Sequence, residues 1–105
     1  MASSYLVNRW GGREDNPTVA KMLAALNELD AHDPEHPDCW LSDELGWTIA
    51  AHENEVLVLE NVESGEGPWH LANAPRTIVL QLWQALQRGD LNEIRKRDWK
   101  DGYGD

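Results

Sequence analysis

Three potential zinc ligands stand close together in one segment of this 105-residue chain. His32, His36 and Cys39 are spaced H-x3-H-x2-C, and Asp33 and Asp38 lie among them. Imidazole, thiolate and carboxylate groups are all zinc ligands, so a small metal-binding domain is one interpretation of the pattern. The spacing is loose, however, no second cluster completes a four-ligand site, and two prolines restrict how the segment folds back. We therefore expect no metal and no cofactor here, but a polar loop with one half-buried cysteine.

Acid–base catalysis is the second chemistry that the residue types allow. His52 and Glu53 are adjacent, and paired carboxylates are the catalytic groups of glycosidases. The carboxylates of this chain are spread over expected loops and turns, in a domain with little room for a pocket. The chain has no nucleophile elbow, and no helix follows Gly65 and Gly67 as a phosphate-binding loop requires. We expect that the protein is not an enzyme.

Charge is the strongest feature of the sequence. No Lys or Arg occurs between Lys21 and Arg76, and this segment holds twelve of the 19 acidic residues. The flanks are nearly balanced, so the segment accounts for the formal net charge of −10. Such a field repels nucleic acid and anionic membrane surfaces and attracts basic protein partners. The basic run 95–97 is too short for a nucleic-acid surface and is better placed at the C-terminal end of a helix.

Length and cysteine usage bound the class of protein. We expect one domain over residues 1–105, ordered roughly over 5–100. The single cysteine, Cys39, excludes an intramolecular disulfide and fits a reducing compartment. The N-terminal residues do not form the apolar run of a signal peptide, and nothing approaches the about 20 apolar residues of a membrane span. We expect a cytoplasmic protein.

The apolar pattern indicates an antiparallel sheet. An apolar run predicts a first strand at 5–10, at the edge of the sheet, and a further strand begins at 39–41. Alternation over 45–52, a polar turn, and a Val- and Leu-rich run over 55–62 predict a hairpin with a central second strand. A last short strand is expected at 69–71.

Three helices are expected around this sheet. Asn16 and the proline after it predict a helix start, with apolar spacing that continues to about residue 30. A second helix is expected from Pro75 to residue 88, with Asn73 as its cap, and a capping box at Asp90 opens a short third helix. The fold class predicted is α+β, a small antiparallel meander of three to five strands with helices packed on one face.

The acidic residues concentrate in the expected turns and loops, where two tryptophans stand beside them. A protein-binding surface needs carboxylates that steer a basic partner toward it and indoles that become buried in the interface. The competing interpretation is a solvated acidic surface, with both tryptophans in the core. The predicted steering residues are Asp33, Glu35, Asp38, Asp43, Glu44, Glu53, Glu55, Glu63 and Glu66, and the predicted anchors are Trp40 and Trp69.

This layout resembles the small acidic immunity proteins of bacterial polymorphic and contact-dependent toxin systems, in particular those paired with deaminase-type toxins. The corresponding stretches are PTVAKMLAALNELD, GWTIAAHENEVLVLEN and RTIVLQLWQALQRG, followed by Trp99. The resemblance covers about residues 5–100 and rests on the arrangement of elements and acidity. It implies a protein that binds a cognate toxin domain with a basic surface and covers its active site, the toxin acting on nucleic acids or nucleotides. The alternative is a self-associating structural or adaptor domain whose tryptophans form a homo-oligomer interface.

Overall fold

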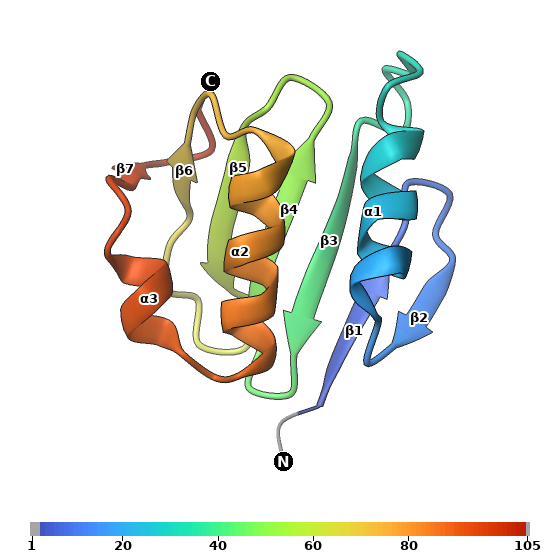
Figure 1. The fold of residues 1–105 in the computed structure, drawn as a ribbon. Helices are drawn as coiled ribbons and strands as arrows, with labels where there is room; N and C mark the ends of the chain where they lie inside the picture. Colours follow the sequence, from blue (N-terminus) through green and yellow to red (C-terminus); the bar gives the residue numbers. More distant parts are fainter. Residues whose placement is uncertain (1–2, 105) are drawn as a thin grey trace.

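Within residues 3–104, which the computed structural model describes, seven strands form one sheet accompanied by three helices (Figure 1). The strands are β1 (Ser4–Val7), β2 (Arg13–Asp15), β3 (Asp38–Asp43), β4 (Trp47–His52), β5 (Leu57–Asn61), β6 (Trp69–Leu71) and β7 (Lys100–Asp101). The helices are α1 (Val19–Glu28), α2 (Arg76–Gln87) and α3 (Leu91–Arg95). The sheet order is β2-β1-β3-β4-β5-β6-β7 and every neighbouring pair is antiparallel. The prediction of an α+β fold with an antiparallel sheet is confirmed.

The predicted strand count of three to five is wrong, because two short charged strands escaped the apolar pattern. All residues of β2 and β7 are exposed, and all of them are charged. Strands of this kind are recognised by backbone pairing, not by side-chain alternation. They form the two edges of the sheet, where short charged strands discourage pairing with another chain. β1, expected at an edge, lies between β2 and β3.

The central hairpin agrees with its prediction. In β4 the side chains of Trp47, Ile49 and Ala51 are buried against the helices, and Ile49 pairs with Leu59 of β5. Val58 points to the opposite face and is still only 3% exposed. The unbroken apolar run of β5 therefore marks a strand buried on both faces, as predicted.

The first helix begins two residues later than predicted. Asn16 adopts a left-handed conformation with φ of 46°, and its Oδ1 accepts a hydrogen bond from the Ser4 N–H at 3.0 Å. Thr18 caps the helix instead, its Oγ1 accepting from the Lys21 N–H at 3.3 Å. Asn16 thus extends the β1–β2 pairing at the open end of the hairpin. The Thr18 hydroxyl, two residues on, accepts a free N–H of the first helical turn.

The other two helices start near their predicted positions, and α2 is fixed on the sheet. Asp90 caps α3 by accepting the Glu93 N–H at 3.2 Å, as predicted, whereas no side chain caps α2, which Pro75 precedes. The Trp83 indole N–H donates to the Ile49 carbonyl at 3.0 Å and ties α2 to β4. α1 and α2 lie on the same face of the sheet (Figure 1). None of the helices in residues 3–104 has the length and apolarity to cross a membrane.

Antiparallel pairing gathers the loops at two opposite ends of the sheet. One end carries the β1–β2 turn, the α1–β3 loop and the β4–β5 turn, and we call it the loop end (top of Figure 1). The other carries the β3–β4 turn and the start of the β5–β6 loop, and we call it the turn end. The face of the sheet opposite α1 and α2 is called the open face.

Candidate protein-binding surface

The predicted steering residues divide between the two ends of the sheet and do not form one patch. The loop end carries Asp33, Glu35, Asp38, Glu53 and Glu55. The turn end carries Asp43, Glu44, Glu63 and Glu66. A basic partner that approaches one end therefore meets about half of the predicted set directly.

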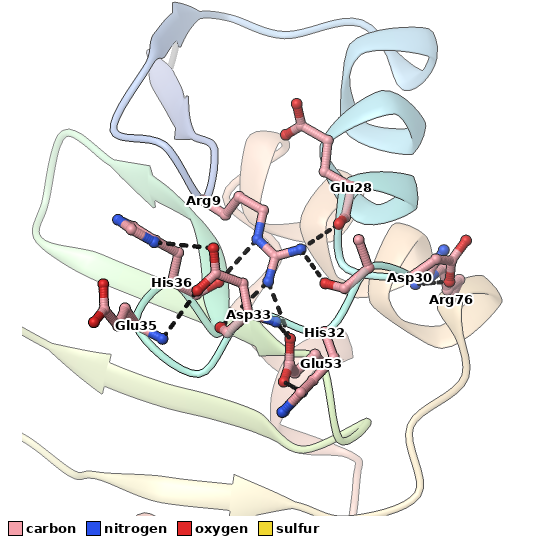
Figure 2. A network of polar contacts seen from close by, with 10 residues as sticks. Arg9, Glu28, Asp30, His32, Asp33, Glu35, His36, Glu53 and Arg76 are labelled. Carbon is pink, nitrogen blue, oxygen red and sulfur yellow. Dashed lines mark hydrogen bonds and ion pairs between the residues drawn. The ribbon is translucent and has the colours of Figure 1, made fainter.

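A buried arginine organises the loop end. Arg9 follows β1, is 4% exposed, and donates to the backbone carbonyls of Ala31 at 2.6 Å and His36 at 2.8 Å (Figure 2). A further hydrogen bond joins it to the Glu28 carbonyl at the end of α1. These carbonyls belong to the α1–β3 loop or the helix end before it, so the guanidinium fixes where this loop runs. A buried guanidinium satisfied by several acceptors is a strong positional constraint.

Glu53 completes this Arg9 network from the β4–β5 turn. Its Oε2 lies 3.0 Å from Arg9 Nη2 and accepts the Asp33 N–H at 3.1 Å, while its Oε1 lies 2.5 Å from His32 Nδ1 (Figure 2). The Asp33 N–H, followed by His32 and Arg9, holds the pKa of Glu53 below its usual value, against a smaller opposing effect of desolvation. Glu53 is therefore an ionised group whose charge is compensated inside the molecule.

The three residues with zinc-ligand chemistry do not converge. His32 pairs with Glu53, His36 Nδ1 lies 3.2 Å from Asp33 Oδ2, and Cys39 is fully buried among the core residues. Burial above all, with nearby Asp38 adding to it, raises the pKa of the Cys39 thiol to about 12. Residues 3–104 contain no group of three such side chains placed to hold a metal ion. The cation at the centre of this loop is the Arg9 guanidinium.

The most exposed indole is one that the sequence analysis did not select. Trp10, in the β1–β2 turn, is 58% exposed, and its ring lies against that of His36 with centroids 4.9 Å apart. Asn8 Oδ1 accepts the N–H groups of Trp10 and Gly12 at 2.9 and 3.0 Å, which closes the turn tightly. The local signal in the sequence is the Gly11-Gly12 pair that follows Trp10, because two successive glycines mark a turn.

The remaining loop-end carboxylates lie in the α1–β3 loop, at the start of β3 and in the β4–β5 turn. Glu35 and Glu55 are exposed, and the Glu35 N–H donates to Asp33 Oδ1 at 3.1 Å. Desolvation pulls the pKa of Asp33 upward, but the Glu35 N–H, His36 and Arg9 together outweigh it and lower the pKa. Asp38 Oδ2 lies 3.7 Å from His52 Nε2. At neutral pH the loop end is thus an anionic surface held by the Arg9 network, with one protruding indole.

The two predicted anchors lie elsewhere. Trp40 is half-buried on the open face, in register with Val7 of β1 and Ala50 of β4. Trp69 is half-buried on the helix side and lines a cavity of about 380 Å³ with Trp99 and Glu66. The structure brings neither of them to the loop end, although both stay accessible in part.

Of the four predicted carboxylates at the turn end, one is structural and three are exposed. Asp43 is 8% exposed, and its Oδ1 accepts the N–H groups of Leu45 and Trp47, each at 2.9 Å. Burial raises the pKa of Asp43, although these hydrogen bonds oppose the rise. Asp43 therefore closes the β3–β4 turn, whereas Glu44, Glu63 and Glu66 face solvent.

Comparison with known proteins identifies no relative: no family model, no curated protein and no solved structure matches this chain. A functional assignment therefore depends on the surface described above.

Proposed function

We propose that this protein is an immunity protein, which binds and neutralises a cognate toxin domain with a basic surface. The observation that carries the proposal is the loop end, where the exposed indole of Trp10 stands beside the acidic α1–β3 loop. Tryptophan is among the residue types enriched at the energetic centre of protein interfaces, and nearby carboxylates favour a basic partner.

The same surface suits inhibition of a toxin that acts on nucleic acids or nucleotides. The substrate groove of such an enzyme is basic, because it must bind phosphates. An anionic protein surface competes for that groove, and its field accelerates association by about 10–1,000-fold. An interface of about 1,600 Å² in total, with Trp10 near its centre, would suffice for a stable complex.

Rigidity of the loop favours tight binding. The α1–β3 loop is held by the Arg9 network at several points along its length. A surface that is already ordered loses little conformational entropy when it meets its partner. The acidic loop is therefore shaped before binding, and the binding free energy is not spent on ordering it.

The test is neutralisation of a toxic domain encoded beside this protein's gene. Co-expression should restore growth, and the purified proteins should form a one-to-one complex. Trp10→Ala should weaken that complex by about 30-fold or more, as expected for a residue at the centre of an interface. Leu45→Ala, which removes a side chain 67% exposed at the turn end, is the matched control and should bind normally. An inhibitor whose affinity is unchanged by Trp10→Ala does not use the loop end.

Self-association is the second candidate, and the open face favours it. Trp40, Val7 and Ala50 form a row across three strands that no helix covers. A size that grows with concentration, and reverts to that of the monomer in Trp40→Ala, would support an adaptor function for this face. A concentration-independent monomer would eliminate it.

A further inference from the structure

A groove opens beside the Arg9 network, between the C-terminal end of α1, the N-terminal end of α2 and the β4–β5 turn. Its volume is about 450 Å³, within the range of about 300–1,000 Å³ of ligand pockets. Apart from Val56, the apolar part of its lining is Leu26, Leu29, Ala51, Leu57, Ala74 and Val79. These side chains come from the core, so the groove is a depression that reaches the apolar interior at one end of the molecule.

The rim of the groove is predominantly anionic. Asp30, Glu53 and Glu55 line it, against the single guanidinium of Arg76. Arg76 is already bonded to Asp30 Oδ1 at 2.7 Å and to the side chain of Asn27. Glu53 is compensated by Arg9. Glu55 has no cationic partner within 4.0 Å among residues 3–104, so its charge is available to a ligand.

The position of Glu55 is fixed by its backbone. The residue adopts φ of 66°, its N–H donates to the His52 carbonyl at 3.1 Å, and its carbonyl accepts the Ala74 N–H at 2.9 Å. The second of these bonds ties the β4–β5 turn to the segment that leads into α2. The backbone that carries the Glu55 side chain is thus fixed beside the groove, and the walls of the groove are joined to each other.

We propose that this groove receives a long cationic side chain, lysine or arginine, from the protein partner. The aliphatic stem would lie on the apolar lining while the charged head remains at the rim beside Glu55, the distribution that such amphipathic side chains favour. This inference rests on the proposed function in one respect only, which is the identity of the protein partner that supplies the cationic side chain.

The ligand chemistry can be tested without the partner. n-Butylguanidinium reproduces the stem and head of arginine, and hexanoate has a similar stem with the opposite charge. Amide resonances of the groove, such as those of Leu57 and Val79, should shift on titration with butylguanidinium and not with hexanoate. Equal shifts with both probes, or none with butylguanidinium, would overturn the proposal.

Two variants with the same change of charge localise the interaction. Glu55→Gln should weaken butylguanidinium binding by about threefold, the effect of one exposed ion pair. Glu63→Gln is the matched control, because this residue is also exposed but lies at the turn end. Equal weakening by both variants would mean that the probe senses only net charge, and this too would contradict the groove.

The partner complex distinguishes this inference from the function on which it rests. If butylguanidinium binds as described but no toxin is neutralised, the groove stands and the immunity function fails. If a toxin is neutralised and Glu55→Gln does not slow or weaken its binding relative to Glu63→Gln, the groove is not part of that interface and the inference fails alone.

Discussion

Nη2 of Arg9 lies 3.0 Å from Oε2 of Glu53, a residue 44 positions away in the chain. The side chain of Arg9 is completely buried and that of Glu53 is 15% exposed. This pair joins the β1–β2 turn to the β4–β5 turn across the α1–β3 loop, and the position of the acidic loop depends on it.

Replacing Arg9 should therefore be the most damaging single charge change in the protein. Arg9→Ala leaves Glu53 and several carbonyls without their donor, and loss of one partner of a buried pair costs about 3–5 kcal/mol of unfolding free energy. Arg13→Ala breaks a pair with Asp15 in which both side chains are more than half exposed, and should cost less than about 1 kcal/mol. Urea unfolding followed by tryptophan fluorescence measures both, and equal losses would contradict the buried network.

Acid should weaken this network in a defined pH range. The pKa of Glu53 and that of Asp33 are lowered in the folded state, from ordinary values of 4.5 and 3.8. A depressed acid pKa contributes stability that is complete above the unfolded value and is lost as pH falls through the folded value. The stability difference between wild type and Glu53→Gln should thus be constant above about pH 5 and shrink at lower pH. A difference that does not change between pH 7 and pH 3 would contradict this assignment.

Cys39 should be chemically inert while the protein is folded. Its thiol is fully buried with a pKa raised to about 12, so almost no thiolate is present at pH 8. We expect Ellman's reagent to label it only after unfolding in urea. Leu45→Cys in a Cys39→Ala background places a thiol at a site whose native side chain is 67% exposed, and should react at once. Rapid labelling of Cys39 in the native protein would show that the core opens there.

The two ends of the sheet should differ in electrostatic steering. Glu35→Gln with Glu55→Gln removes two charges from the loop end, and Glu63→Gln with Glu66→Gln removes two from the turn end. Only the first pair should slow association with a basic partner and flatten its dependence on salt, because steering acts mainly on the on-rate. Stopped-flow measurements at low and high ionic strength decide this. The same on-rate for both double variants would place the partner at neither end.

Regular alternation made the core of the fold predictable from the sequence, whereas long-range polar contacts were not. The hairpin of β4 and β5 was predicted because Ile49 and its neighbours alternate across a half-buried sheet. β2 and β7 have no such pattern, and the helix start at Asn16 was wrong because its side chain serves a strand instead. Each of these errors concerns one short segment. β2 and β7 are defined by backbone pairing with their neighbours, and Asn16 is held by the backbone N–H of Ser4.

Long-range contacts also limited what the sequence could predict of the candidate surface. Its acidic loop was visible in the sequence, but nothing local indicates that Arg9, more than 20 residues earlier in the chain, holds this loop through its backbone carbonyls. Trp10 was missed because exposure depends on the turn that carries it. Trp40 and Trp69, which stand beside acidic residues in the sequence, lie on opposite faces of the sheet, since adjacency along a strand says nothing of the side to which a ring points.

The bonds that shape the acidic loop come from parts of the chain outside it. A synthetic peptide of residues 30–38 would lack Arg9 and Glu53, and would sample many conformations in solution. A partner should accordingly bind this fragment far more weakly than it binds the whole domain. Grafting these residues onto another scaffold would require an arginine and a glutamate to be transplanted with them.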